Sequence, residues 1–218
     1  MKLSSVLIAV ASVFAAANAS ASNITVSTGF SDASAQATAA DYQSVVNAAV
    51  AVASSGYGSL AVGAYDNISN YLLFGSTSSN IAFKSVIDFG VSAANVGAWD
   101  FRFGVDFGKG GAVFLDGVAF GTKSNDMWWN GSYSSPDQFF AFSSTLAAGN
   151  HQLSVYGLEN CCDGGQQAQF RSPATATFTT FNGKDGLNVA AVPEPETYAM
   201  LLAGLGLMGA VARRRKQK

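Results

Sequence analysis

The chain has 218 residues and a formal net charge of −2, and 49% of its residues are hydrophobic. The charge is uneven along the chain, because the segment between Ser20 and Val192 holds six Lys and Arg against twelve Asp and Glu, a net charge of −6. Such an acidic segment repels phosphate, which excludes nucleic acid as a partner, while its length suffices for one domain with a hydrophobic core.

The N-terminus predicts a secretory signal peptide. Met1 and Lys2 precede an apolar run over residues 3–17, and Ala17-Asn18-Ala19 fits the small-x-small cleavage rule. Cleavage after Ala19 makes residues 1–19 the signal peptide, and cleavage two residues later fits the same rule. An uncleaved anchor is the less favoured alternative, because the run is shorter than the roughly 20 apolar residues of a membrane-spanning helix.

The next segment changes character at Asp41. Residues 20–40 are rich in Ser, Ala and Thr and predict a leader or an edge strand. From Asp41 onward, apolar residues recur at helical spacing until Gly56, which predicts one short helix over about 41–55.

Beyond this helix the apolar residues alternate with period two, which is typical of half-buried antiparallel strands. "IAFKSVIDFGV" at 81–91 and "WDFRFGVDF" at 99–107 each place aromatic and branched residues on one face, and Asp116-Gly117 separates two apolar triplets as a hairpin turn. Short strands with glycine-rich turns predict an all-β fold, an antiparallel β-sandwich or jelly roll over residues 20–181, followed by a linker over 182–192.

Trp128, Trp129 and Tyr133 cluster in a polar, glycine-containing loop. Adjacent side chains in an extended segment point to opposite faces, so we expect one tryptophan in the core and the other at the surface. An exposed ring would offer a platform on which a sugar can stack. The alternative, weighted equally, is that both rings pack at the edge of the sandwich.

Cys161 and Cys162 are adjacent and are the two cysteines of the chain. An exported protein meets an oxidising environment, and three states are open for this pair: a vicinal disulfide, two thiols, or intermolecular bridges. We favour the vicinal disulfide as a stiff structural turn between two strands, because the C-x-x-C redox spacing is absent. Two adjacent thiols and the single histidine, His151, do not make a zinc site.

Acidic loop residues are the remaining ligand candidates. Asp116 and Asp163 are weak candidates for calcium, and ordinary turn chemistry is the favoured interpretation, since no EF-hand spacing is present. His151 has no evident nucleophile partner, and neither G-x-S-x-G nor H-E-x-x-H occurs. We therefore assign no catalytic residue and no cofactor, and hydrolysis by an aspartate pair is a minority alternative.

The C-terminus has three parts in order. The triplet Pro193, Glu194, Pro195 precedes a stretch without charge over 197–212, and the stretch is followed by the basic block Arg213, Arg214, Arg215, Lys216. This pattern predicts a short transmembrane helix whose basic end stays in the cytoplasm. The stretch also matches G-x-G-x-x-G, and we reject a dinucleotide site because that motif requires a preceding strand.

Residues 193–218 resemble the PEP-CTERM sorting signal of Gram-negative bacteria. The resemblance implies handling by an exosortase and the export machinery, with transient anchorage in the inner membrane. It also implies delivery to the cell surface or the extracellular matrix, commonly in bacteria that make exopolysaccharide.

The block from Ile81 to Phe181 contains Cys161-Cys162-Asp163-Gly164 and resembles the PEP-CTERM subgroup named for a Cys-Cys-x-Gly (CCXG) motif, which implies no known enzymatic activity. More weakly, "LDG" followed by "LAAGNHQLSVYG" is similar to lectin-like sandwiches of the protective-antigen and yeast-adhesin type. Their calcium site uses paired aspartates, and no adjacent Asp-Asp pair stands here to receive it.

These observations lead to three functional expectations. The leading one is a non-enzymatic, exosortase-sorted protein of the surface or matrix, with a structural or adhesive role linked to exopolysaccharide and biofilm. The second is a carbohydrate-binding module that uses Trp128 or Trp129, with or without calcium. The third is a glycan hydrolase.

Overall fold

The structure is a computed structural model that describes residues 21–75 and 79–189, together with the single positions 204, 205, 208 and 213. The chain divides into two compact units, one formed by Ala19–Ala190 and the other by the two ends of the chain. The predicted signal peptide and the Pro193-Glu194-Pro195 triplet lie outside the described residues, as do Arg214, Arg215 and Lys216. Within the described part, no helix has the length and apolar character needed to cross a membrane.

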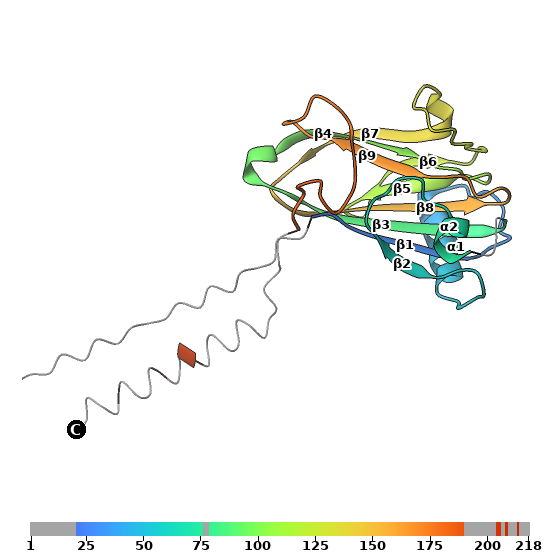
Figure 1. Cartoon of the computed structure of the whole chain (residues 1–218), viewed down its shortest axis with the longest axis horizontal. Helices are drawn as coiled ribbons and strands as arrows, with labels where there is room; N and C mark the ends of the chain where they lie inside the picture. Colours follow the sequence, from blue (N-terminus) through green and yellow to red (C-terminus); the bar gives the residue numbers. More distant parts are fainter. Residues whose placement is uncertain (1–20, 76–78, 190–203, 206–207, 209–212, 214–218) are drawn as a thin grey trace, which may run out of the picture. The chain divides into compact units, whose positions relative to one another are not determined.

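The unit Ala19–Ala190 is built on two antiparallel sheets, which Figure 1 shows as stacked layers. The larger sheet has the order β2-β1-β3-β8-β5-β6, with β1 (Asn23–Phe30), β2 (Ser59–Val62), β3 (Ile81–Val91), β5 (Gly111–Leu115), β6 (Val118–Lys123) and β8 (Gly149–Glu159). The smaller sheet has the order β10-β9-β4-β7, with β4 (Gly97–Gly104), β7 (Phe139–Leu146), β9 (Gln167–Arg171) and β10 (Thr179–Thr180). The predicted antiparallel β-sandwich is confirmed.

The core lies between the two sheets and is filled by the residues that the period-two pattern placed on one face. From β3 these are Ile81, Phe83, Ile87 and Phe89, and from β4 they are Trp99, Phe101 and Phe103; all of them are buried. Ser85 interrupts the apolar face of β3 and is itself buried, because its hydroxyl accepts a hydrogen bond from Tyr65 at 2.9 Å. A buried polar group that is paired in this way costs little.

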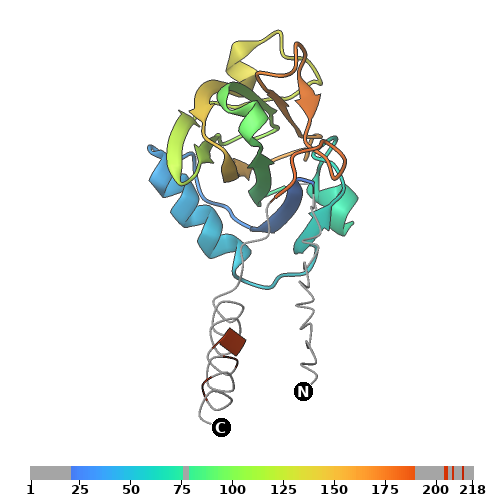
Figure 2. The same cartoon turned by 90° about the vertical axis from the view of Figure 1, so that its left-hand side faces the viewer.

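Helix α1 (Ala39–Val50) covers the outer face of the larger sheet, and Figure 2 shows it in blue along one side of the domain. Thr38 caps it by accepting a hydrogen bond from the Asp41 backbone, and Tyr42 and Val46 pack onto Phe114 and other sheet residues in a second apolar cluster. The helix was expected over about 41–55. It ends at Val50 because Ser and Gly follow closely and the residues after it are exposed.

Three further helical turns were not predicted. Helix α2 (Asn70–Phe74) is capped by Ser69 and ends at Gly75, which has a φ of 82°. The two 3-10 turns are η1 (Ala93–Asn95) and η2 (Pro136–Gln138). All three are too short to show a helical period in the sequence.

Two expectations at the ends of the domain are wrong. Strand β1 was considered an edge strand or a leader, but it lies between β2 and β3, with Ile24 and Val26 in the core. The linker was placed at 182–192, but Leu187 is buried in the core, and its carbonyl accepts a hydrogen bond from Gly90. In both segments, a few apolar side chains among small polar residues pack into the core between the sheets.

The hairpin prediction at Asp116-Gly117 is correct. These two residues join β5 to β6 and have φ values of 50° and 78°, as a two-residue turn of the I′ type requires. Gly117 therefore occupies a position that strongly favours glycine.

Candidate functional site

One loop builds most of the candidate site. Residues 124–138 join β6 to β7, and backbone hydrogen bonds in both directions between Met127 and Phe107 fix the start of the loop to the core. Farther along, the side chain of Asn125 donates to the carbonyl of Asp137, and that of Lys123 donates to the carbonyl of Pro136. The loop is held in shape by its own contacts, which favours a preformed binding surface.

Of the two tryptophans of this loop, one is exposed, as one of the two expectations has it, while the other is buried on the outside of the smaller sheet and not in the core. Trp129 is 9% exposed and Trp128 is 65% exposed. Trp129 lies over Gly104 of β4, where an added Cβ would come within 2.3 Å of its indole ring. Because Gly104 has no side chain, the indole ring of Trp129 can pack against β4 on the outer face of the smaller sheet.

Trp129 forms one wall of a polar hollow of about 280 Å³. Besides Trp129 and its neighbours Asn130 and Gly131, the hollow is lined by Asp66, Asn67, Gly165 and Gln167. The side chain of Gln167 donates to Asp66 at 2.7 Å, which ties β9 to the loop before α2. Three segments far apart in the sequence thus supply amide and carboxylate groups to one concavity.

A second hollow of about 470 Å³ lies on the other side of Asn130, which lines both. It is lined by Trp128, Asn130, Ser134, Ser135, Pro136, Asp137 and Gln138. The exposed ring of Trp128 is thus an apolar surface beside hydroxyl, amide and carboxylate groups. A few oriented polar groups around an apolar surface are typical of small-molecule sites.

Tyr133, the third aromatic residue predicted for a platform, lies farther along the sheet. Its ring is 4.5 Å from that of Trp129 and 3.7 Å from the guanidinium carbon of Arg102 on β4. Phe178, from the segment after β9, lies 3.9 Å from the same guanidinium carbon. Tyr133 is therefore half-buried and engaged by neighbouring side chains, and Trp128 is the open platform.

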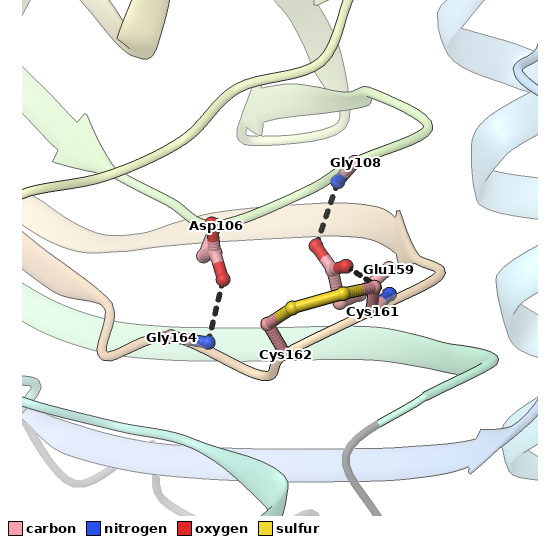
Figure 3. The surroundings of a disulfide bond; sticks show 6 residues. All are labelled: Asp106, Gly108, Glu159, Cys161, Cys162 and Gly164. Atoms are coloured by element: carbon pink, nitrogen blue, oxygen red, sulfur yellow. Dashed lines mark hydrogen bonds between the residues drawn. A yellow bond between two sulfur atoms is a disulfide. The ribbon is translucent and has the colours of Figure 1, made fainter.

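The β8–β9 connection borders the first hollow and contains the two cysteines, which the structure joins in a disulfide (Figure 3). Two carboxylates hold this turn. Glu159 accepts hydrogen bonds from the backbone of Gly108 at 2.7 Å and of Cys161 at 2.5 Å, and Asp106 accepts one from Gly164 at 2.5 Å. Gly165 follows directly and is a wall of the hollow, so the turn positions part of that wall.

Burial raises the pKa values of the acidic residues in this turn. The pKa of Glu159 is raised to about 7 and that of Asp163 to about 6, in each case chiefly because the carboxyl group is removed from water. Burial also raises the pKa of Asp106, and its charge raises those of the other two. The hydrogen bonds from backbone N–H groups oppose these shifts without cancelling them.

The two calcium candidates belong to separate networks. Asp163 accepts hydrogen bonds from the backbone of Asn70 and Tyr71, whereas Asp116 accepts from the backbone of Gln152 and pairs with His151 at 2.7 Å. Among the residues that the structure describes, no three His, Cys, Asp or Glu side chains gather as metal ligands would. Both aspartates thus accept hydrogen bonds from the backbone of distant segments, which ties their turns to α2 and to β8.

Of the seven residues that line the first hollow, sequence reasoning named Trp129 alone. Asp66, Asn67 and Gln167 carry no motif, and only Asn67 leaves a local trace, a φ of 51° in a polar turn. Their role depends on a contact between residues 101 positions apart, which no local pattern encodes.

Comparison with known proteins identifies a motif in the C-terminal segment and finds structures similar to the β-sandwich domain. Residues 191–216 match the PEP-CTERM protein-sorting motif. This motif indicates an exported protein that an exosortase processes and that is sorted to the cell surface. No curated protein sequence matches the chain.

Solved structures match the sandwich. The PA14 domain of the MpAFP antifreeze protein is similar with a TM-score of 0.50 at 9% identity, over 78% of this chain and 91% of that one. The PA14 sugar-binding domain from an RTX adhesin is similar with a TM-score of 0.50 at 11% identity, over 79% of this chain and 99% of that one. At such identities the likeness shows a common fold, a PA14-like β-sandwich.

Proposed function

We propose that this chain is a non-enzymatic carbohydrate-binding protein of the cell surface or extracellular matrix of a Gram-negative bacterium, with exopolysaccharide as its ligand. The observation that carries the proposal is the pair of hollows around Asn130, where the exposed ring of Trp128 lies beside amide, hydroxyl and carboxylate groups. A sugar ring stacks on an aromatic face through its C–H groups while its hydroxyls bond to such side chains.

Two further findings support the proposal. The sorting motif directs the chain to the surface, where polysaccharide is the abundant partner, and one protein of similar fold is a sugar-binding domain of an adhesin. An adhesive role in biofilm and membership in the Cys-Cys-x-Gly subgroup remain parts of the proposal.

A binding function fits the hollows better than hydrolysis. Glycoside hydrolysis uses two carboxyl groups on either side of the bond, whereas Asp66 is the one carboxylate lining the first hollow and Asp137 the one lining the second. His151 has both ring nitrogens engaged within the fold, Nδ1 with Asp116 and Nε2 with the carbonyl of Ala147.

The test is binding of the secreted protein to an array of acidic and neutral bacterial polysaccharides. We expect Trp128→Ala to weaken binding roughly tenfold, because it removes the stacking surface while leaving the core intact. Phe30→Ala is the matched control, since Phe30 is also exposed, at 52%, and lines neither hollow. Equal binding by Trp128→Ala and wild type would contradict the proposed site, and release of new reducing ends from a bound polysaccharide would contradict the non-enzymatic role.

A further inference from the structure

The outer face of the smaller sheet continues from the first hollow. On β4, Gly104 lies under Trp129, and Arg102 and Asp100 follow on the same face at alternate positions. On β9, Gln167, Gln169 and Arg171 stand opposite these three residues in register. Successive residues on one face of a strand are about 7 Å apart, so a polysaccharide chain held at the hollow has this face directly beside it.

Arg102 is placed on this face with its positive charge unpaired. Its guanidinium lies between the rings of Tyr133 and Phe178, and its Nε and Nη2 both donate to the single amide oxygen of Gln169. In the described part of the chain, the one ion pair of an arginine or lysine is that of Arg171 with Asp100, so no carboxylate lies within salt-bridge distance of Arg102. The side chain is half-buried, and the bonds to Gln169 hold the guanidinium in a fixed position while the Nη1 donor stays available on its far edge.

Arg171 adds a second positive charge on the same face. It lies 5.1 Å from the ring of Phe178 and pairs with Asp100 at 2.7 Å, and this ion pair is exposed to solvent. Exposed ion pairs contribute little free energy, so a ligand can exchange for one of the partners. Two of the six basic residues between Ser20 and Val192 therefore lie together on the face that continues from the hollow, in a segment with a net charge of −6.

We propose that Arg102 and Arg171 bind carboxylate groups of the polysaccharide, which makes the ligand an acidic polymer that contains uronic acids. The inference rests on the proposed carbohydrate-binding function and specifies its ligand class. A guanidinium held between two aromatic rings donates to a carboxylate without further ordering, and the two neighbouring positive charges offset locally the repulsion between an anionic polymer and the acidic domain.

The experiment compares polygalacturonate with the same polymer after reduction of its carboxyl groups to alcohols, using the secreted protein in both cases. We expect wild type to bind polygalacturonate at least about tenfold more tightly than the reduced polymer, with the preference falling as salt is raised. Arg102→Gln should lose this preference, Arg102→Lys should keep part of it, and Arg171→Gln should weaken it.

Lys84→Gln is the charge-matched control, because Lys84 lies on the larger sheet beside Tyr156. Melting curves of all variants separate a loss of binding from a loss of folding. Equal binding of the two polymers by wild type, with binding still dependent on Trp128, would overturn this inference and leave the proposed function standing. Binding to neither polymer, nor to any polysaccharide of the array, would overturn both.

Discussion

The carboxyl group of Glu159 is buried in the folded protein. The residue is 2% exposed, and its two oxygens accept hydrogen bonds from backbone N–H groups, one from Cys161 in the adjoining turn and one from Gly108 in the β4–β5 connection. Its raised pKa, about 7 against an ordinary value of 4.5, means that the folded protein holds a proton there that the unfolded chain has already released.

The first prediction concerns stability against pH. Between about pH 4.5 and 7, the folded state binds more protons at Glu159 than the unfolded state does, so the free energy of unfolding should fall as the pH rises through this window and level off above it. Asp163, with a pKa raised to about 6 from 3.8, should add a fall in the lower part of the window. Melting temperatures at pH 5, 6 and 7.5 measure the effect.

Glu159→Gln is the matched variant for this prediction. The amide keeps one acceptor oxygen and cannot ionise, so the dependence on pH between 6 and 7.5 should largely disappear. A wild type that becomes steadily more stable from pH 5 to 7.5 would contradict the raised pKa of Glu159.

At the scale of secondary-structure elements, β4 positions part of the proposed site, because its residue Gly104 leaves room for a ring of the site. Most of this strand follows the alternation of buried aromatic and outward polar residues, and Gly104 breaks it at the end of the strand. The break makes room for Trp129, which belongs to a loop that begins twenty residues later in the chain.

Gly104→Ala should therefore be destabilising. An added Cβ would lie 2.3 Å from the indole of Trp129, closer than real contacts allow, and overpacking of this kind costs about 1–3 kcal/mol. Gly63→Ala is the control, because no atom lies within 4 Å of the position its Cβ would take. The readouts are thermal melting and tryptophan fluorescence, and an unchanged melting temperature for Gly104→Ala would show that Trp129 is not seated on β4.

At the scale of the whole molecule, the sandwich was predictable and the site only in part. Strand β4 and most of β3 alternate with period two, because each has one face in the core between the sheets, and Asp116-Gly117 has the residue types its turn requires. The exposure of one tryptophan of the pair was one of two equally weighted expectations, so the local pattern alone did not decide it. Two other features of the site could not be predicted, because they join segments that are distant in the sequence. These are the contact of Asp66 with Gln167 and the position of Arg102 between Tyr133 and Phe178.

The last prediction concerns the boundary of the folded domain. Among the residues that the structure describes, those of the core clusters run from Ile24 to Leu187, so deletion of residues 192–218 should leave a domain with a cooperative transition and an unchanged melting temperature. Deletion from Phe181 onward should destabilise it by several kcal/mol. Phe181 is fully buried against Phe89 and Phe170, and removal of a buried phenylalanine alone costs about 3–5 kcal/mol.

Circular dichroism melts of the two truncated proteins decide the boundary. If both unfold alike, residues 192–218 contribute to the stability of the sandwich; if both stay as stable as the full chain, the core does not need the segment after β10.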